Sequence, residues 1–318
     1  MEMRNWTNSF LLFTIFLDLI SGSHGDVFRV PALDANQKDL LQLLELGDDI
    51  KFDVPALYVF GDSTVDSGNN NFLSSTSKAN YSPFGIDFVD GKATGRFSNG
   101  RTKADFIAQV VGLPFPSPCL GLSKEEQKIL RTGVNYGSSA CGILPDTGKF
   151  FGTCLNFEKQ IDLFETTVKN LQSSFDSKES MANYLSKSLF FISIGNADVS
   201  TGYDFLDNNT KQQTPFPNFA QAISQNFSSK IRKLYDLGAR KFLVSNVGMT
   251  DTRDTCCVAA ENGTRPCIRD IAPCNNRNEH VYFDPFHASE STHFILAKRC
   301  LKESSICTPI SLVDLLRA

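Results

Sequence analysis

Short apolar runs alternate with longer helical patterns along the chain. The runs cover 56–60, 189–194, 241–247 and, more weakly, 280–283. Each is too short for a core helix and is mostly continuous rather than alternating, which is typical of strands covered on both faces of a parallel sheet. The pattern therefore predicts a buried, mainly parallel sheet.

Amphipathic segments lie between these runs. In 218–237 the apolar residues recur at intervals of three or four, which places them on one face of a helix, and Gly238 favours its end. Similar patterns predict helices over 156–171, 289–301 and, in a shorter form, 36–46. Strands that alternate with helices predict an α/β fold, here a three-layer α/β/α sandwich in one domain. We expect long surface loops at 200–217 and 250–279.

The first 25 residues differ from the rest. Arg4 precedes an apolar run over 10–20, and the small residues Ser23 and Gly25 follow, which is the layout of a secretory signal peptide. A buried N-terminal helix is the alternative. We expect a signal peptide at 1–25, an N-terminal extension of unknown role at 26–53 and one domain at 54–318. After residue 25, no stretch approaches the roughly 20 apolar residues that span a bilayer.

Nine cysteines follow the expected leader, at 119, 141, 154, 256, 257, 267, 274, 300 and 307. In the oxidising compartment that secretion implies, most should pair, and an odd number leaves at least one unpaired. The group over 256–274 lacks the paired C-x₂₋₄-C spacing of structural zinc sites, so disulfides are the better interpretation, with pairing left open. Four N-x-S/T sequons fit glycosylated surface loops, at Asn80, Asn208, Asn226 and Asn262.

The composition of the chain and the absence of several motifs exclude some classes of function. The 318 residues carry 31 basic and 35 acidic side chains, for a net charge of −4. Nucleic-acid-binding proteins normally have a basic surface, so we expect no nucleic-acid partner. The sequence has no P-loop, no G-x-G-x-x-G after a strand and no metal-ligand spacing, so we expect neither a cofactor nor a metal.

A histidine that a carboxylate orients is the usual base for a nucleophilic serine near neutral pH. Beyond 1–25 the chain has three histidines, His280, His287 and His293. Only His287 follows an acid at three-residue spacing in an apolar setting, in the DPFH segment that begins at Asp284. Asp284 could reach Nδ1 and leave Nε2 for a serine. On spacing alone, a helix N-cap beside a surface histidine is the more common explanation.

Ser63 is the candidate nucleophile. It stands in FGDS, directly after the first predicted strand, and the polar stretch TVDSGNNN follows it. Open α/β sheets bind ligands at the carboxyl ends of parallel strands, where main-chain N–H groups can stabilise an oxyanion. A polar turn with a serine N-cap is an equal alternative for Ser63 alone. No G-x-S-x-G elbow is present, which disfavours the α/β-hydrolase fold.

With GDS at 61–63 and D-x-x-H at 284–287, the sequence resembles the plant GDSL esterase/lipase family of the SGNH hydrolase superfamily. The resemblance runs from about Val54 to the C-terminus. It is carried by blocks in family order: FGDSTVDSGNNN (60–71), PFGIDF (83–88), TGRFSNGRTKADFIAQVVGLP (94–114), NYGSSACGIL (135–144), FFISIG (190–195) and GARKFLV (238–244). It implies a flavodoxin-like SGNH hydrolase fold. It also implies that Ser63 is the nucleophile, His287 the general base and acid, and Asp284 the residue that orients His287.

The sequence departs from the family pattern at the expected oxyanion hole. The family's third block reads G-x-N-D with a donating asparagine, whereas 195–198 reads GNAD and places Ala197 there. Asn196 stands one residue early, and neighbouring side chains in extended or loop backbone usually point apart. Loss of one such donor costs about 2.7–4 kcal/mol, or roughly 10²–10³ in kcat. In the second block Ser139 and Ala140 replace glycine, which a main-chain donor tolerates if the backbone keeps its shape.

The leading hypothesis is a secreted serine hydrolase of the cell wall or apoplast that cleaves carboxylic esters, either lipids or other plant acyl esters, through an acyl-Ser63 intermediate. Ala197 predicts reduced activity. One alternative is a catalytically weak or silent SGNH-fold protein that binds an ester or a glycan. Another is an acyltransferase that uses the same three residues, which sequence does not distinguish from a hydrolase.

Overall fold

Four short strands form one sheet in the computed structural model, within residues 30–44, 46, 52–246, 255–259 and 266–317, the part of the chain that the structure describes. The strands are β1 (Leu57–Gly61), β2 (Leu189–Ser193), β3 (Lys241–Ser245) and β4 (Cys307–Thr308). The α-helices are α1 (Gln37–Leu43), α2 (Lys103–Val110), α3 (Lys124–Ile129), α4 (Phe157–Leu171), α5 (Lys178–Lys187), α6 (Asn208–Gln213), α7 (Phe216–Asp236), α8 (Glu290–Lys302) and α9 (Leu312–Arg317).

The strands lie in the order β1-β2-β3-β4. The first three run parallel, and β4 pairs with β3 in the antiparallel direction. The segment 132–138 runs along the outer edge of β1, where the N–H of Leu57 donates to the Thr132 carbonyl and the N–H of Tyr136 to the Val59 carbonyl. The expected mainly parallel sheet is therefore confirmed.

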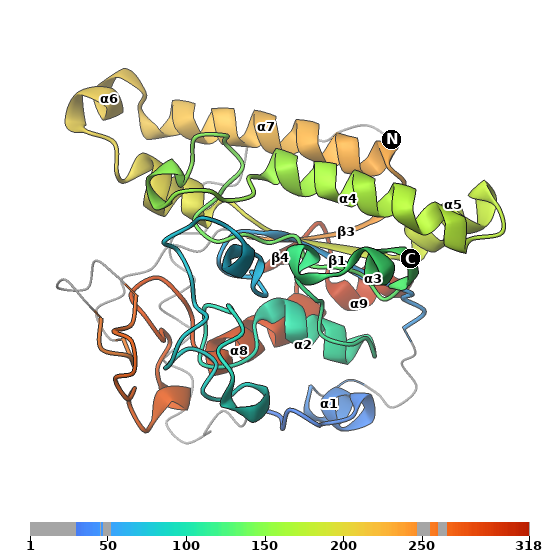
Figure 1. Ribbon diagram of the computed structural model, residues 1–318, viewed down its shortest axis with the longest axis horizontal. Helices are drawn as coiled ribbons and strands as arrows, with labels where there is room; N and C mark the ends of the chain where they lie inside the picture. Colours follow the sequence, from blue (N-terminus) through green and yellow to red (C-terminus); the bar gives the residue numbers. More distant parts are fainter. Residues whose placement is uncertain (1–29, 45, 47–51, 247–254, 260–265, 318) are drawn as a thin grey trace.

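Alternate residues of each strand face opposite layers of helices, because successive side chains of a strand point to opposite sides. One set packs against α4, α5 and α7: Tyr58, Phe60, Phe190 and Ile192. The other set packs against α1, α2, α8 and α9: Leu57, Val59, Leu189, Phe191 and Leu243. Figure 1 shows these two helical layers above and below the sheet. The three-layer α/β/α sandwich is confirmed, and burial on both faces explains why the strands are continuous apolar runs.

The amphipathic patterns fold as predicted. α7, α4 and α8 occupy the three long segments, and α1 occupies the short one near the N-terminus. Asn156 and Ser289 cap α4 and α8, each accepting a hydrogen bond from the main-chain N–H three residues on, which fixes the start of each helix. The N-terminal α1 contributes Leu40 and Leu41 to the core beneath β1.

Two expectations about local structure are wrong. The run 280–283 is not a strand of the sheet, because Tyr282 forms only isolated bridges, to Thr255 and Ala288. The region 200–217 is not a plain loop, since it contains the end of a π-helix (Asp198–Tyr203) and α6. Asp207 caps α6 by accepting from two main-chain N–H groups. The six residues of α6 are all polar, so no apolar pattern predicts this helix. β4 was not predicted, and its two residues are too few for a pattern.

The region 250–279 is more than a surface loop where the structure describes it. Cys256, Cys257 and Cys267 are buried in a small third core with Phe84, Phe97 and Phe283. Four disulfides are present, as expected from the cysteine count, and Cys119 is a buried free thiol; the pairs are Cys141–Cys154, Cys256–Cys274, Cys257–Cys267 and Cys300–Cys307. The described residues hold no cluster of metal-ligating side chains.

The sequons occupy different settings. Asn80 is exposed in a loop and Asn208 begins the exposed helix α6. Asn226 lies inside α7, where its side-chain amide donates to the Ala222 carbonyl at 2.9 Å, so the surface-loop expectation is wrong for this position. Asn262 and the expected signal peptide lie outside the described residues. In the described part of the chain, we find no helix with the length and hydrophobicity to cross a bilayer.

Candidate active site

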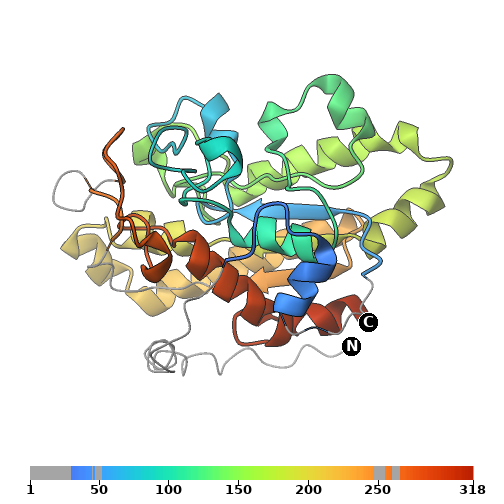
Figure 2. The same ribbon diagram turned by 90° about the horizontal axis from the view of Figure 1, so that it is seen from below.

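Ser63 lies just beyond β1, at the carboxyl end of the parallel sheet. β1 ends at Gly61, and the next N–H, that of Asp62, still donates to the Ser193 carbonyl of β2 at 3.1 Å. The Ser63 side chain is partly exposed, and its hydroxyl has no hydrogen-bond partner among the described residues. Figure 2 shows β1 pointing toward the end of the molecule where the orange-red loop 266–289 lies. The contact between Ser63 and His287 stays a prediction.

Asp284 and His287 meet in a tight turn. Nδ1 of His287 lies 2.7 Å from Oδ2 and 2.8 Å from Oδ1 of Asp284. Oδ1 also accepts the main-chain N–H groups of Phe286 and His287, at 2.7 and 2.8 Å. Asp284 is fully buried and His287 is 7% exposed. The contact that the spacing suggested is thus present, and the occupied Nδ1 leaves Nε2 to accept a proton.

Aromatic packing supports the His287 ring. The ring lies 4.7 Å from the centroid of Phe97, which in turn packs 5.7 Å from Phe84. Phe283, directly before Asp284, joins the same buried group. The turn from Asp284 to His287 therefore packs against the small, disulfide-bonded third core.

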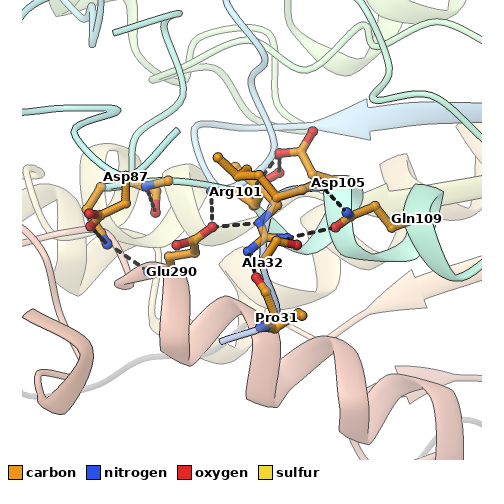
Figure 3. Close-up of polar contacts among 12 residues, drawn as sticks. Pro31, Ala32, Asp87, Arg101, Asp105, Gln109 and Glu290 are labelled. Carbon is orange, nitrogen blue, oxygen red and sulfur yellow. Dashed lines mark hydrogen bonds and ion pairs between the residues drawn. The ribbon is translucent and has the colours of Figure 1, made fainter. Parts of the chain in front are cut away.

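The start of α8, three residues after His287, is tied to two other segments. Glu290 accepts from Nε and the main-chain N–H of Arg101 at 2.7 and 3.0 Å, and its own N–H donates to Asn99 Oδ1 at 2.8 Å. The Arg101 guanidinium also donates to the carbonyls of Pro31 and Ala32 (Figure 3). The segment that was expected to be an extension of unknown role is thus linked, through Arg101, to the element that follows His287.

Asp62 organises the turn around Ser63. Its Oδ1 accepts from the main-chain N–H and the hydroxyl of Thr64, at 3.0 and 2.8 Å. Its Oδ2 accepts from the N–H groups of Asn196 and Ala197, at 3.1 and 3.4 Å. This buried carboxylate therefore holds the residue after Ser63 and the expected oxyanion segment together.

Ala197 is buried at the start of a helical segment, not in extended or loop backbone as assumed from the sequence. Its φ and ψ are −63° and −37°. Adjacent side chains on a helix lie about 100° apart, so Asn196 still does not occupy the direction of residue 197. The position that the family pattern gives to a donating asparagine ends in a methyl group here.

In the second block, the main-chain N–H of Ser139 is already engaged in a hydrogen bond. The N–H of Ser139 donates to Oδ2 of Asp66 at 3.0 Å, and Oδ1 of Asp66 accepts from the N–H groups of Gly68 and Asn69. Burial raises the pKa of Asp66 to about 6, against these hydrogen bonds. Ala140 takes a left-handed backbone, with φ 67°. The backbone does not leave the Ser139 N–H pointing to a ligand.

Comparison with known proteins decides the family. The GDSL-like lipase/acylhydrolase family matches residues 57–285. A GDSL esterase/lipase of Arabidopsis thaliana is 38% identical to this chain, over 80% of this chain and 86% of its own length. A second Arabidopsis GDSL esterase/lipase is 32% identical over 96% of both chains.

The chain belongs to the GDSL-like lipase/acylhydrolase family. The expected fold class and a GDSL-type ester hydrolase are thereby confirmed at the level of the family. The matched region begins with β1 and ends at Pro285, between Asp284 and His287. The roles of Ser63, Asp284 and His287 within this GDSL-type chain stay predictions.

Lys103 of this GDSL chain was not among the site residues predicted from the sequence. Lys103 is 6% exposed and donates to the hydroxyls of Ser193 and Ser245, at the carboxyl ends of β2 and β3. A signal was available, because Lys103 is the first residue of α2, and a cation is unfavourable at a helix N-terminus. A lysine at the start of a helix therefore indicates nearby groups that compensate for its charge.

Proposed function

We propose that this chain is a serine hydrolase that cleaves carboxylic ester bonds through an acyl-Ser63 intermediate. The observation that carries the proposal is the buried Asp284 carboxylate hydrogen-bonded to Nδ1 of His287. This arrangement fixes the tautomer in which Nε2 is unprotonated and can take the Ser63 proton. The placement of Ser63 at the carboxyl end of β1 supports its role as the nucleophile.

In this mechanism Ser63 Oγ attacks the ester carbonyl carbon while Nε2 of His287 takes its proton. The Asp284 carboxylate stabilises the imidazolium, which then protonates the departing alcohol. Water, deprotonated by His287, attacks the acyl carbon, and the imidazolium returns this proton to Ser63 Oγ as the acid departs. The Ser63 N–H donates to no group in the described part of the chain, so we assign it as an oxyanion donor.

A low turnover forms part of the proposal. Ala197 lacks a side-chain donor and the Ser139 N–H is held by Asp66, so two expected oxyanion donors are missing or engaged. Each such donor contributes about 2.7–4 kcal/mol to transition-state binding. The same observation favours the second candidate, an SGNH-fold protein that binds an ester or a glycan with little or no turnover.

Hydrolysis of p-nitrophenyl acetate and butyrate by the purified protein tests the proposal. We expect measurable activity that Ser63→Ala and His287→Ala abolish and that His280→Ala, the matched histidine control, retains. Activity that survives Ser63→Ala would overturn the assigned mechanism. Activity undetectable in the wild type, together with saturable binding of an ester analogue, would favour the binding protein.

Secretion is also proposed, on the signal-like pattern at 1–25 and the four disulfides, which persist in oxidising compartments. Expression of the full chain in a secreting eukaryotic host tests it. We expect the protein in the medium with its N-terminus near Asp26. Retention inside the cells with Met1 intact would refute this part of the proposal.

A further inference from the structure

Lys103 lies buried among three parallel strand ends. Its Nζ donates to Ser245 Oγ at 2.7 Å and to Ser193 Oγ at 3.3 Å. Both serines are buried, and each is the last residue of its strand. Long charged side chains are seldom buried unless a partner compensates for the lost hydration. The neighbouring negative charge is that of Asp62, directly before Ser63.

A chain of hydrogen bonds connects Lys103 to both neighbours of Ser63. Ser193 Oγ lies 3.0 Å from Thr64 Oγ1, which donates to Asp62 Oδ1 at 2.8 Å. Because Thr64 uses its proton on Asp62, it accepts from Ser193, and Ser193 in turn accepts from Lys103. Every proton in the chain thus points from the ammonium toward the carboxylate, and such aligned bonds strengthen one another.

We propose that Lys103 is a positioning residue for the nucleophile: acting through Ser193 and Thr64, its ammonium group orients the Asp62 carboxylate and holds the turn that carries Ser63. The inference rests on the proposed role of Ser63. Asp62 also accepts the N–H groups of Asn196 and Ala197, so the same charge fixes the segment beside the expected oxyanion hole. A cation here also offsets the unfavourable effect of the Asp62 anion on a developing oxyanion.

The charge of Lys103 changes within an accessible pH range. Burial lowers the pKa of the Lys103 ammonium to about 8, although the charge of Asp62 opposes this shift. On α8, His293 faces the same region, and burial together with the charge of Lys103 lowers its pKa to about 3, so it is neutral at working pH. On α2, Asp105 is paired with Arg96 at 2.8 Å. Lys103 is therefore the facing group expected to titrate between pH 7 and 9.

The test is the rate at which a fluorophosphonate probe labels the serine, measured from pH 6 to pH 10. We expect the wild-type rate to fall as the pH rises through about 8, when Lys103 loses its proton. Lys103→Met should label at least about ten-fold more slowly at pH 7, the effect of one lost charged hydrogen bond, and should lack the alkaline fall. Lys103→Arg, where it folds, should move the fall above pH 10. Lys187→Met, which removes an exposed lysine paired with Asp53, should match the wild type.

Two controls separate the possible failures. Labelling that persists in Ser63→Ala would overturn the role of Ser63 itself. Labelling that Ser63→Ala abolishes but Lys103→Met leaves unchanged in rate and pH profile would overturn the role of Lys103 alone. Circular dichroism establishes that each variant is folded. If Lys103→Met does not fold, the wild-type profile decides, and a rate that stays level from pH 7 to pH 10 refutes the proposal.

Discussion

Asp284 presents its two oxygens to His287 in different ways. Oδ2 lies 2.7 Å from the ring nitrogen Nδ1, while Oδ1 lies 2.8 Å from Nδ1 and also accepts the main-chain N–H groups of Phe286 and His287. The main chain thus fixes the carboxylate, and the carboxylate fixes the ring. Because Oδ1 must remain an acceptor for the main chain, an amide in place of this carboxylate would put its NH₂ group at the Oδ2 position, 2.7 Å from Nδ1.

Asp284→Asn should therefore inactivate the enzyme with little change in fold. The amide oxygen would keep the two main-chain hydrogen bonds, so the amide NH₂ would face Nδ1 and place the imidazole proton on Nε2. That tautomer does not accept the proton of Ser63, and we expect kcat to fall by about 10³–10⁴. Ester hydrolysis at pH 7.5 measures it, with circular dichroism as the control for folding. A loss of less than ten-fold would show that Asp284 does not orient the base.

Ala197→Asn should restore the missing donor. Residue 197 is 4% exposed at the start of a helical segment whose N–H groups face Asp62, so the backbone is already held. We expect kcat to rise about ten-fold or more if a missing oxyanion donor limits the rate. Ala197→Leu is the matched control, since it adds similar bulk without a donor. An equal kcat for the Asn and Leu variants would mean that another group already stabilises the oxyanion.

Arg101→Met should destabilise the protein strongly. Arg101 is 2% exposed, pairs with Glu290 at 2.7 Å, and binds the carbonyls of Pro31 and Ala32. Its loss leaves a buried carboxylate without its ion-pair partner, at a cost of about 3–5 kcal/mol. Breaking the exposed Lys187–Asp53 pair by Lys187→Met should cost no more than about 1 kcal/mol. Urea unfolding compares the two, and equal losses would contradict the importance assigned to the Arg101 cluster.

Cys119 should be unreactive in the folded protein. Burial raises the pKa of its thiol to about 12, so the reactive thiolate is scarce at pH 8, and its Sγ donates to Asn69 Oδ1. We expect no labelling by iodoacetamide under native conditions. After unfolding without a reductant, the chain should take up one label. Uptake of three or more would show that one of the four disulfides is not formed.

Most strands and the long helices could be predicted from the sequence because their apolar patterns lie within single short segments. A strand buried on both faces must be apolar throughout, so β1, β2 and β3 were visible as runs. The long helices were visible because one apolar stripe faces the sheet. β4 was not visible, since its two residues depend on pairing with β3 and on the Cys300–Cys307 disulfide.

In the candidate site, the sequence predicted only contacts between residues that are close together in the chain. Asp284 and His287 are three residues apart, so their spacing could suggest a contact. The partners of Lys103 stand 90 and 142 positions away, and no spacing rule relates them. The same holds for the Ser139 N–H, which donates to Asp66 across 73 positions in the sequence.

The pH dependence of stability should contain a component from His293. Neither of its ring nitrogens has a hydrogen-bond partner in the described part of the chain, and burial lowers its pKa from 6.5 to about 3. Between these values the unfolded chain binds a proton that the folded chain does not. This contribution to stability is therefore complete above pH 6.5 and is lost as the pH falls toward 3, with a slope of up to about 1.4 kcal/mol per pH unit.

His293→Leu should remove that component. We expect urea unfolding at pH 7, 5.5 and 4.5 to show a shallower loss of stability in the variant, by about 1 kcal/mol per pH unit below pH 6. The carboxylates titrate in both proteins and cancel in the comparison. His280→Leu, at a partly exposed position, serves as the matched control and should follow the wild type. Parallel curves for the wild type and His293→Leu would mean that the folded protein admits a proton to this imidazole.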